Sequence, residues 1–89
     1  MLTPVYTTQF KKDLKKYKKA NKDFNEFRRI INCLLNQKKL AQKQREHKLT
    51  GNYKDRHECH IAPDWLLIYK KQEKRIIFER TGSHSDLFK

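Results

Sequence analysis

The chain has 89 residues, of which 22 are Lys or Arg and 10 are Asp or Glu, and its formal net charge is +12 at pH 7. A chain of this length predicts one domain, residues 1–89, whose single core leaves no room for a deep pocket. A charge of this size attracts nucleic acid, anionic lipid or acidic proteins, but it does not identify a reaction.

Membrane and disulfide-rich classes are not expected. The sequence has no apolar run near the roughly 20 residues of a membrane span and no signal-peptide core, so we expect a cytoplasmic protein without a membrane partner. Cys33 and Cys59 fall in a helical and a strand pattern, which predicts two unpaired, mostly buried thiols. Residues 1–48 hold 14 Lys or Arg against 4 acids, and residues 49–89 hold 8 against 6. The first half therefore supplies most of the positive field.

The first half predicts an edge strand and a helical hairpin. Residues 2–6 are apolar around Pro4, which suits an edge strand. Thr7 or Thr8 can cap the first helix, and Asn21 or Asp23 the second. The polar face of the first helix carries Lys11, Lys12, Lys15, Lys16, Lys18 and Lys19. The two apolar stripes comprise Phe10, Leu14 and Tyr17, and then Phe24, Phe27, Ile30, Ile31, Leu34 and Leu35.

The second half predicts three strands. Residues 38–48 form a polar connector, and Gly51-Asn52 marks a turn. Residues 56–61, 66–70 and 75–81 then show strand patterns with very short separations, which allow only hairpins. We therefore expect an α+β fold in which an N-terminal edge strand and a two-helix hairpin precede an antiparallel meander, with the hairpin covering one face of the sheet.

Histidines concentrate in this second half. His47, His57, His60 and His84 all follow the helices, together with Asp64 and Arg80. Metal-independent RNA cleavage requires a base for the ribose 2′-hydroxyl, an acid for the leaving 5′-oxygen and a cation for the phosphorane. These residue types supply all three functions.

Strand alternation separates the candidates. Cys59 and Ile61 point to the predicted core, whereas Glu58 and His60 point to the open face. His57 shares the parity of Cys59 and is the weakest candidate. The parity of Arg80 predicts the inner face, although a bulge at the strand end can redirect it.

The alternation also argues against a metal site. His57 and Cys59 face away from Glu58 and His60, and the sequence lacks paired metal-ligand spacing and nucleotide-binding glycine motifs. We therefore expect no metal and no cofactor.

Three stretches resemble a known family. Residues 47–51 read HKLTG, residues 56–69 read RHECHIAPDWLLIY, and residues 79–88 read ERTGSHSDLF. In order and spacing they are similar to the YafQ branch of the RelE-like toxins. The resemblance implies the same α+β fold and an mRNA endonuclease that acts at the ribosomal A site. It also implies an acidic cognate antitoxin, through which the complex binds operator DNA.

The resemblance also implies site residues. Arg80 would stabilise the phosphate, and His84 would be the general acid. The base and orienting roles would fall to His47, His60 or Asp64. Candidate substrate contacts are Phe88, Trp65 and Lys54: Phe88 would stack on a base, which is worth about 1–3 kcal/mol, and Trp65 either stacks likewise or packs in the core.

A different class of function stays open from the residues alone. A basic protein that binds RNA or the ribosome without cutting would block translation by occupancy. Such a binder needs cations and aromatic rings, but it has no use for the pattern of His60, Asp64, Arg80 and His84.

Overall fold

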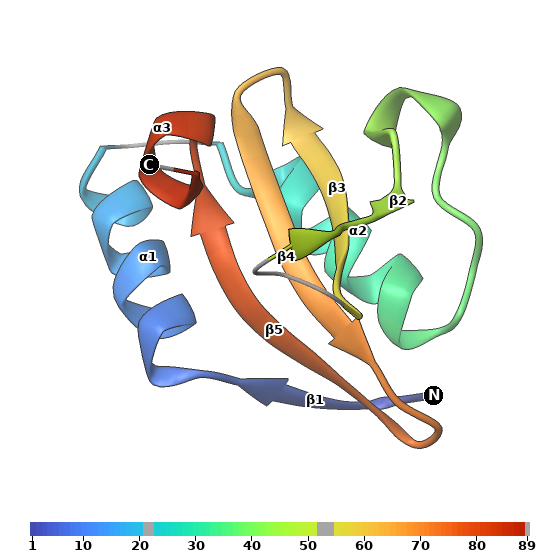
Figure 1. Cartoon of the computed structure of the whole chain (residues 1–89). Coiled ribbons are helices and arrows are strands. Elements are labelled where there is room, and N and C mark those ends of the chain that lie inside the picture. The colour runs from blue at the N-terminus through green and yellow to red at the C-terminus, as the bar shows by residue number, and fades with distance from the viewer. Residues whose placement is uncertain (21–22, 52–54, 89) are drawn as a thin grey trace.

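The protein, a computed structural model that describes residues 1–20, 23–51 and 55–88, forms a five-stranded sheet covered by helices (Figure 1). Its elements are β1 (Thr3–Tyr6), α1 (Thr8–Lys19), α2 (Asn25–Leu35), the 3-10 helix η1 (Gln42–Gln44), β2 (His47–Lys48), β3 (His57–Ala62), β4 (Trp65–Lys71), β5 (Arg75–Gly82) and α3 (His84–Leu87). The expected α+β order is confirmed. The polar connector predicted over residues 38–48 contains two short elements that were not predicted, η1 and β2.

The sheet has the strand order β1-β5-β4-β3-β2. Strands β2 to β5 pair antiparallel, whereas β1 pairs parallel with β5 from Thr3 opposite Arg75 to Tyr6 opposite Phe78. Because β1 is an edge strand, Pro4 can lie in it without removing an N–H that a second neighbour needs. The predicted edge strand and the predicted meander are therefore both confirmed.

The helices begin close to the predicted caps. Thr7 Oγ1 accepts the Phe10 N–H at 3.0 Å at the start of α1. Phe24 occupies the cap position of α2, where Asp23 Oδ1 accepts the Asn25 N–H at 2.9 Å. Asp23 thus satisfies an N-terminal donor from one residue before the cap position; the alternative cap, Asn21, lies outside the described residues.

Both helices cover one face of the sheet, with α2 behind it and α1 beside β5 in Figure 1. The main core joins their apolar stripes to β3, β4 and β5, and its fully buried members include Phe10, Ile30, Cys59, Leu67, Ile76 and Phe78. A smaller cluster of Leu66, Ile68 and Leu87, with Leu49 against it, lies on the opposite face. The candidate site is built around this second cluster.

The two cysteines are unpaired, as predicted. Cys59 is fully buried and Cys33 partly so. Burial raises the pKa of the Cys59 thiol to about 12, so that this group stays protonated at neutral pH. Within the described ranges, none of the helices is long and apolar enough to cross a membrane.

Candidate active site

One row of paired residues crosses the sheet from β2 to β5. His47 lies opposite Glu58, Glu58 opposite Ile68, and Ile68 opposite Arg80. Directly paired residues project to the same face of a sheet, and Ile68 belongs to the cluster away from α1 and α2. His47, Glu58 and Arg80 therefore share that face.

A bulge determines the direction of Arg80. Simple alternation would group Arg80 with Ile76 and Phe78, which are buried under the helices. The register between β4 and β5 shifts, however, so that Tyr69 pairs with Phe78 and Ile68 with Arg80, leaving Glu79 as the extra residue. This bulge reverses the parity of the strand end. Of the two directions that the sequence left open for Arg80, the one set by a bulge is therefore found.

The next row on the same face contains His60, Leu66 and Gly82. His60 lies on the face of the sheet that was predicted for it, but its side chain is largely covered. The His60 side chain is only 12% exposed, and that of Glu58 only 6%. Glu58 Oε1 lies 3.4 Å from His47 Nε2 and 3.7 Å from His60 Nε2. The two imidazoles therefore converge on one buried carboxylate.

Helix α3 returns the end of the chain to this face. Ser83 and Asp86 form a capping box at its start, and Leu87 packs on Leu66 and Ile68. Gly82 permits this return, because a Cβ at its position would lie 3.2 Å from the Cβ of Asp86 and 3.4 Å from Cδ2 of Leu87. The residues after β5 thus form a short helix docked on the sheet.

Asp64, in the turn between β3 and β4, holds the start of α3. Its Oδ1 accepts the backbone N–H of His84 at 3.0 Å and lies 2.9 Å from His84 Nδ1. Because a carboxylate can only accept, Nδ1 carries the proton, and Nε2 is left for a substrate. The His84 backbone N–H, and then the imidazole, hold the pKa of Asp64 below its ordinary value.

His84 links the cluster to an exposed aromatic ring. Its ring centroid lies 5.9 Å from that of His60 and 6.3 Å from that of Phe88. Phe88 is 43% exposed, which is unusual for a large apolar side chain and suits a stacking surface. Three histidines, two carboxylates and this ring therefore lie together, with Arg80 on the same face.

Other sequence candidates lie elsewhere. His57 faces the helix side and stacks on Tyr69, with ring centroids 5.6 Å apart. Trp65 is 6% exposed, stacks on Tyr17 and Phe27, and donates to Thr81 Oγ1 at 2.9 Å, so its position matches the packing alternative. Lys54 lies outside the described residues.

The sequence analysis did not select Glu58 as a site residue. It had placed Glu58 and His60 on one face through their spacing of two, which is the signal that could have identified it. The Ser83-x-x-Asp86 spacing similarly could have predicted the capping box of α3.

The comparisons with known proteins agree with this fold. A family model described as the bacterial toxin of type II toxin-antitoxin systems, YafQ, matches residues 2–89. The class is therefore that of the small toxins of such systems. Within it, the chain belongs to the YafQ family, and the resemblance seen in the sequence is confirmed.

Individual relatives are similar over nearly their whole length. The mRNA interferase toxin YafQ of Escherichia coli K12 is 39% identical over 84 residues, which cover 93% of this chain and 91% of that protein. A copper-bound mutant toxin from Helicobacter pylori superposes with a TM-score of 0.95 at 34% identity, covering 99% and 100% of the two chains. YafQ in the E. coli DinJ-YafQ toxin-antitoxin complex gives 0.91 at 37% identity, covering 99% and 98%.

The H. pylori mutant toxin is described as copper-bound. In residues 1–20, 23–51 and 55–88, no group of three or more His, Cys, Asp or Glu side chains is arranged to hold a metal ion.

Proposed function

We propose that this chain is a toxin that cleaves mRNA and so inhibits translation, and that the cluster around Glu58 and His84 is its active site. Family membership and the named activity of the E. coli relative, an mRNA interferase, support the reaction class. The observation that carries the proposal is the convergence of His47, His60 and His84, from three separate elements, on one face.

His60 and His84 are suited to opposite ends of one proton transfer. His60 takes the proton of the ribose 2′-hydroxyl, whose oxygen attacks the adjacent phosphorus. His84, in its imidazolium form, gives the Nε2 proton to the departing 5′-oxygen. A 2′,3′-cyclic phosphate and a 5′-hydroxyl result, with each proton accounted for. The 5.9 Å between the two rings suits a pair that flanks a single phosphate.

The remaining polar residues orient and stabilise this pair. Asp64 fixes the tautomer of His84, as the 2.9 Å contact at Nδ1 implies. Glu58 orients His60 and His47, because a buried carboxylate is stabilised only by groups that stay close to it. Arg80 offers a planar guanidinium to the phosphate oxygens as negative charge develops there.

The surroundings of the site suit an extended RNA chain. A hollow of about 510 Å³ lies beside Asp64 and Ser83, and a second of about 380 Å³ lies beside His60 with Lys43 and Arg45 at its wall. Phe88 offers a stacking surface beside His84. These shallow, open features fit a polymer rather than an enclosed small molecule.

The proposed partners follow from charge and from the relatives. The substrate is mRNA on the translating ribosome, at its A site, which implies a cytoplasmic enzyme. An acidic antitoxin would neutralise the +12 chain, as the E. coli relative's complex with DinJ suggests, and operator DNA would be bound only through that partner.

Single substitutions separate cleavage from binding. We expect His84→Ala and Arg80→Ala each to reduce cleavage of a translated message by at least about a hundredfold, because each removes a transition-state interaction. Primer extension on messages from translating extracts would measure the loss, with growth arrest as a second readout. His57→Phe, a histidine change on the opposite face, is the matched control and should cleave normally.

The rival function predicts the reverse pattern. If the protein blocks translation only by occupancy, His84→Ala will still arrest growth, whereas charge reversal of Lys11, Lys12 and Lys15 on α1 will abolish the arrest. That outcome would reject the nuclease proposal.

A further inference from the structure

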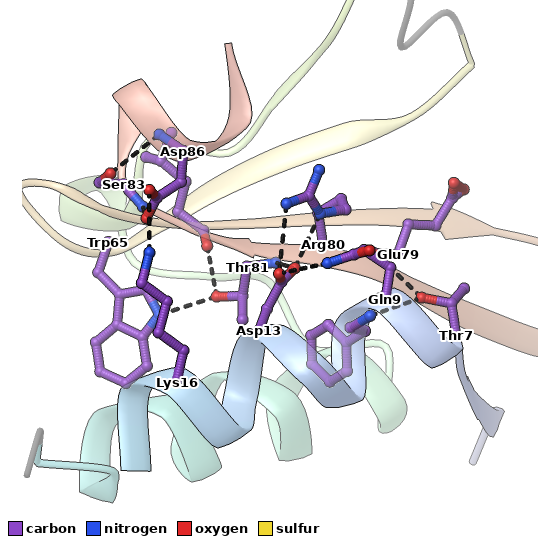
Figure 2. A network of polar contacts seen from close by, with 12 residues as sticks. Thr7, Gln9, Asp13, Lys16, Trp65, Glu79, Arg80, Thr81, Ser83 and Asp86 are labelled. Carbon is purple, nitrogen blue, oxygen red and sulfur yellow. Dashed lines mark hydrogen bonds and ion pairs between the residues drawn. The ribbon is translucent and has the colours of Figure 1, made fainter. Parts of the chain in front are cut away.

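Where β1 ends, the edge of β5 is bonded by side chains of α1 and of its cap residue Thr7. The pairing with β1 stops at Phe78. Beyond it, Thr7 Oγ1 donates to the carbonyl of Glu79 at 2.9 Å, and Asp13 Oδ2 accepts the N–H of Thr81 at 3.1 Å (Figure 2). On this edge, the part of β5 that carries Arg80 is therefore held by side chains of Thr7 and α1, while β4 pairs with its other edge.

Asp13 also contacts the side chain of Arg80. Its Oδ2 accepts from Arg80 Nε at 2.9 Å and its Oδ1 from Nη2 at 3.3 Å, so the carboxylate meets the guanidinium through both oxygens. Gln9 Nε2 donates to Oδ1 at 3.1 Å and fixes the carboxylate from the helix side. The Asp13 side chain is 11% exposed and that of Arg80 27%, so water screens the pair less than it would a surface pair.

The position of this carboxylate is unexpected for an RNA-binding surface. Lys12 and Lys16 line the same small hollow, and Asp13 is the one acid among the six lysines of α1. A negative charge here weakens the attraction for a phosphate. Its effect on the geometry of Arg80 is favourable. An arginine side chain has several rotamers, and a partner that binds the guanidinium through two oxygens restricts them.

We propose that Asp13 is a positioning residue that holds the Arg80 guanidinium in the orientation needed at the scissile phosphate. The inference rests on the proposed function, in which Arg80 stabilises the reacting phosphate. It assigns to α1 a part in the reaction beyond its cationic charge. It also predicts effects of opposite sign on substrate binding and on cleavage, which neither a structural contact nor a simple charge effect would produce.

Asp13→Asn separates these effects. An asparagine retains an oxygen for the Thr81 N–H, but it loses the charge and the second acceptor for Arg80. We expect the single-turnover cleavage rate on programmed ribosomes to fall about ten- to a hundredfold, as small misplacements of catalytic groups do. The half-saturating protein concentration should decrease, because the variant carries one more net positive charge.

Glu73→Gln, in the exposed turn between β4 and β5, makes the same change of charge away from the site and should leave the rate unchanged. The double variant Asp13→Asn/Arg80→Ala should cleave no more slowly than Arg80→Ala alone, because Asp13 acts through Arg80. Thermal unfolding of each variant verifies that it is folded.

The Arg80 Nε–H signal in NMR spectra provides a readout that does not depend on activity. It should be protected from solvent exchange in the parent chain and should lose that protection in Asp13→Asn. An unchanged cleavage rate in Asp13→Asn, with Arg80→Ala inactive, would overturn the inference alone. Full cleavage by Arg80→Ala would overturn the proposed role of Arg80 and the inference with it.

Discussion

At the scale of single residues, two histidines on β3 show how strand parity sets chemical roles. His60 faces the site and shares Glu58 with His47. His57, three residues earlier, faces the helix side, where its Nδ1 is buried without a hydrogen-bond partner among the residues that the structure describes. Burial lowers the pKa of His57, which favours its neutral form. The same residue type is thus a proposed base at one position and a packing group at the other.

His57→Phe should stabilise the protein. Phe can stack on Tyr69 as His57 does, and it removes a buried polar atom whose isolation costs about 1 kcal/mol. A histidine whose pKa is lowered on folding contributes stability above its unfolded value of about 6.5, and this contribution is lost as the pH falls through the folded pKa. The advantage of Phe should therefore grow below pH 6.5.

Chemical denaturation at pH 7.5 and pH 5.5 would measure both effects. A variant that is less stable than the parent at both pH values would show that His57 makes interactions that the structure does not indicate.

At the scale of elements, α3 depends on its contacts with the rest of the protein. Four residues are too few for an isolated helix, so α3 persists only through its caps and its packing. Asp64 and Asp86 accept backbone N–H groups at its start, and Lys16 of α1 contacts Asp86 Oδ1 at 3.3 Å (Figure 2). The helix that carries His84 is therefore held by charged groups together with the packing of Leu87.

The docking of α3 should depend on pH in the acid range. The N–H of His84 and that of Ser83 are the main reasons that the pKa values of Asp64 and Asp86 lie below the ordinary carboxyl value. A carboxyl with a lowered folded pKa contributes stability above its unfolded pKa of about 4, and this contribution is lost as the pH falls through the folded value. We expect α3 to stay docked down to about pH 4 and to loosen below it.

Hydrogen exchange of the His84 amide across this range would follow the loosening. Asp64→Asn should remove the His84 part of the response. Loosening that begins near pH 6 would instead show that groups other than these carboxylates hold α3.

The elements also show what can be predicted from the sequence. The two long helices and β3 to β5 carry enough apolar positions for their periodicity to be clear, and all were predicted. Elements η1, β2 and α3 were not, because elements of two to four residues form through tertiary contacts. The direction of Arg80 depends on the bulge at Glu79, and the contact of Asp13 on the rotation of α1, and neither leaves a signal in the residue pattern.

At the scale of the whole molecule, charge and chemistry are separated along the chain. Most of the +12 charge belongs to residues 1–48, whereas the proposed site residues after His47 all lie in the second half, namely His60, Asp64, Arg80, His84 and Phe88. The first half reaches the site through His47 of β2, through Asp13 and Lys16 of α1, and through Lys43 and Arg45 at the hollow beside His60. The first half therefore attracts RNA and braces the site, and the second half provides the proposed acid, base and phosphate ligand.

The end groups of the fragments of a cleaved message test most directly whether His60 and His84 act on the ribose 2′-hydroxyl and the leaving 5′-oxygen. We predict a 2′,3′-cyclic phosphate on the upstream fragment and a 5′-hydroxyl on the downstream fragment. Once the cleavage position is mapped, a second message can carry a single 2′-deoxy nucleotide immediately 5′ of the scissile phosphate. This message should resist cleavage at that position. A 5′-phosphate on the downstream fragment, or cleavage at the 2′-deoxy position at the normal rate, would contradict the proposed mechanism.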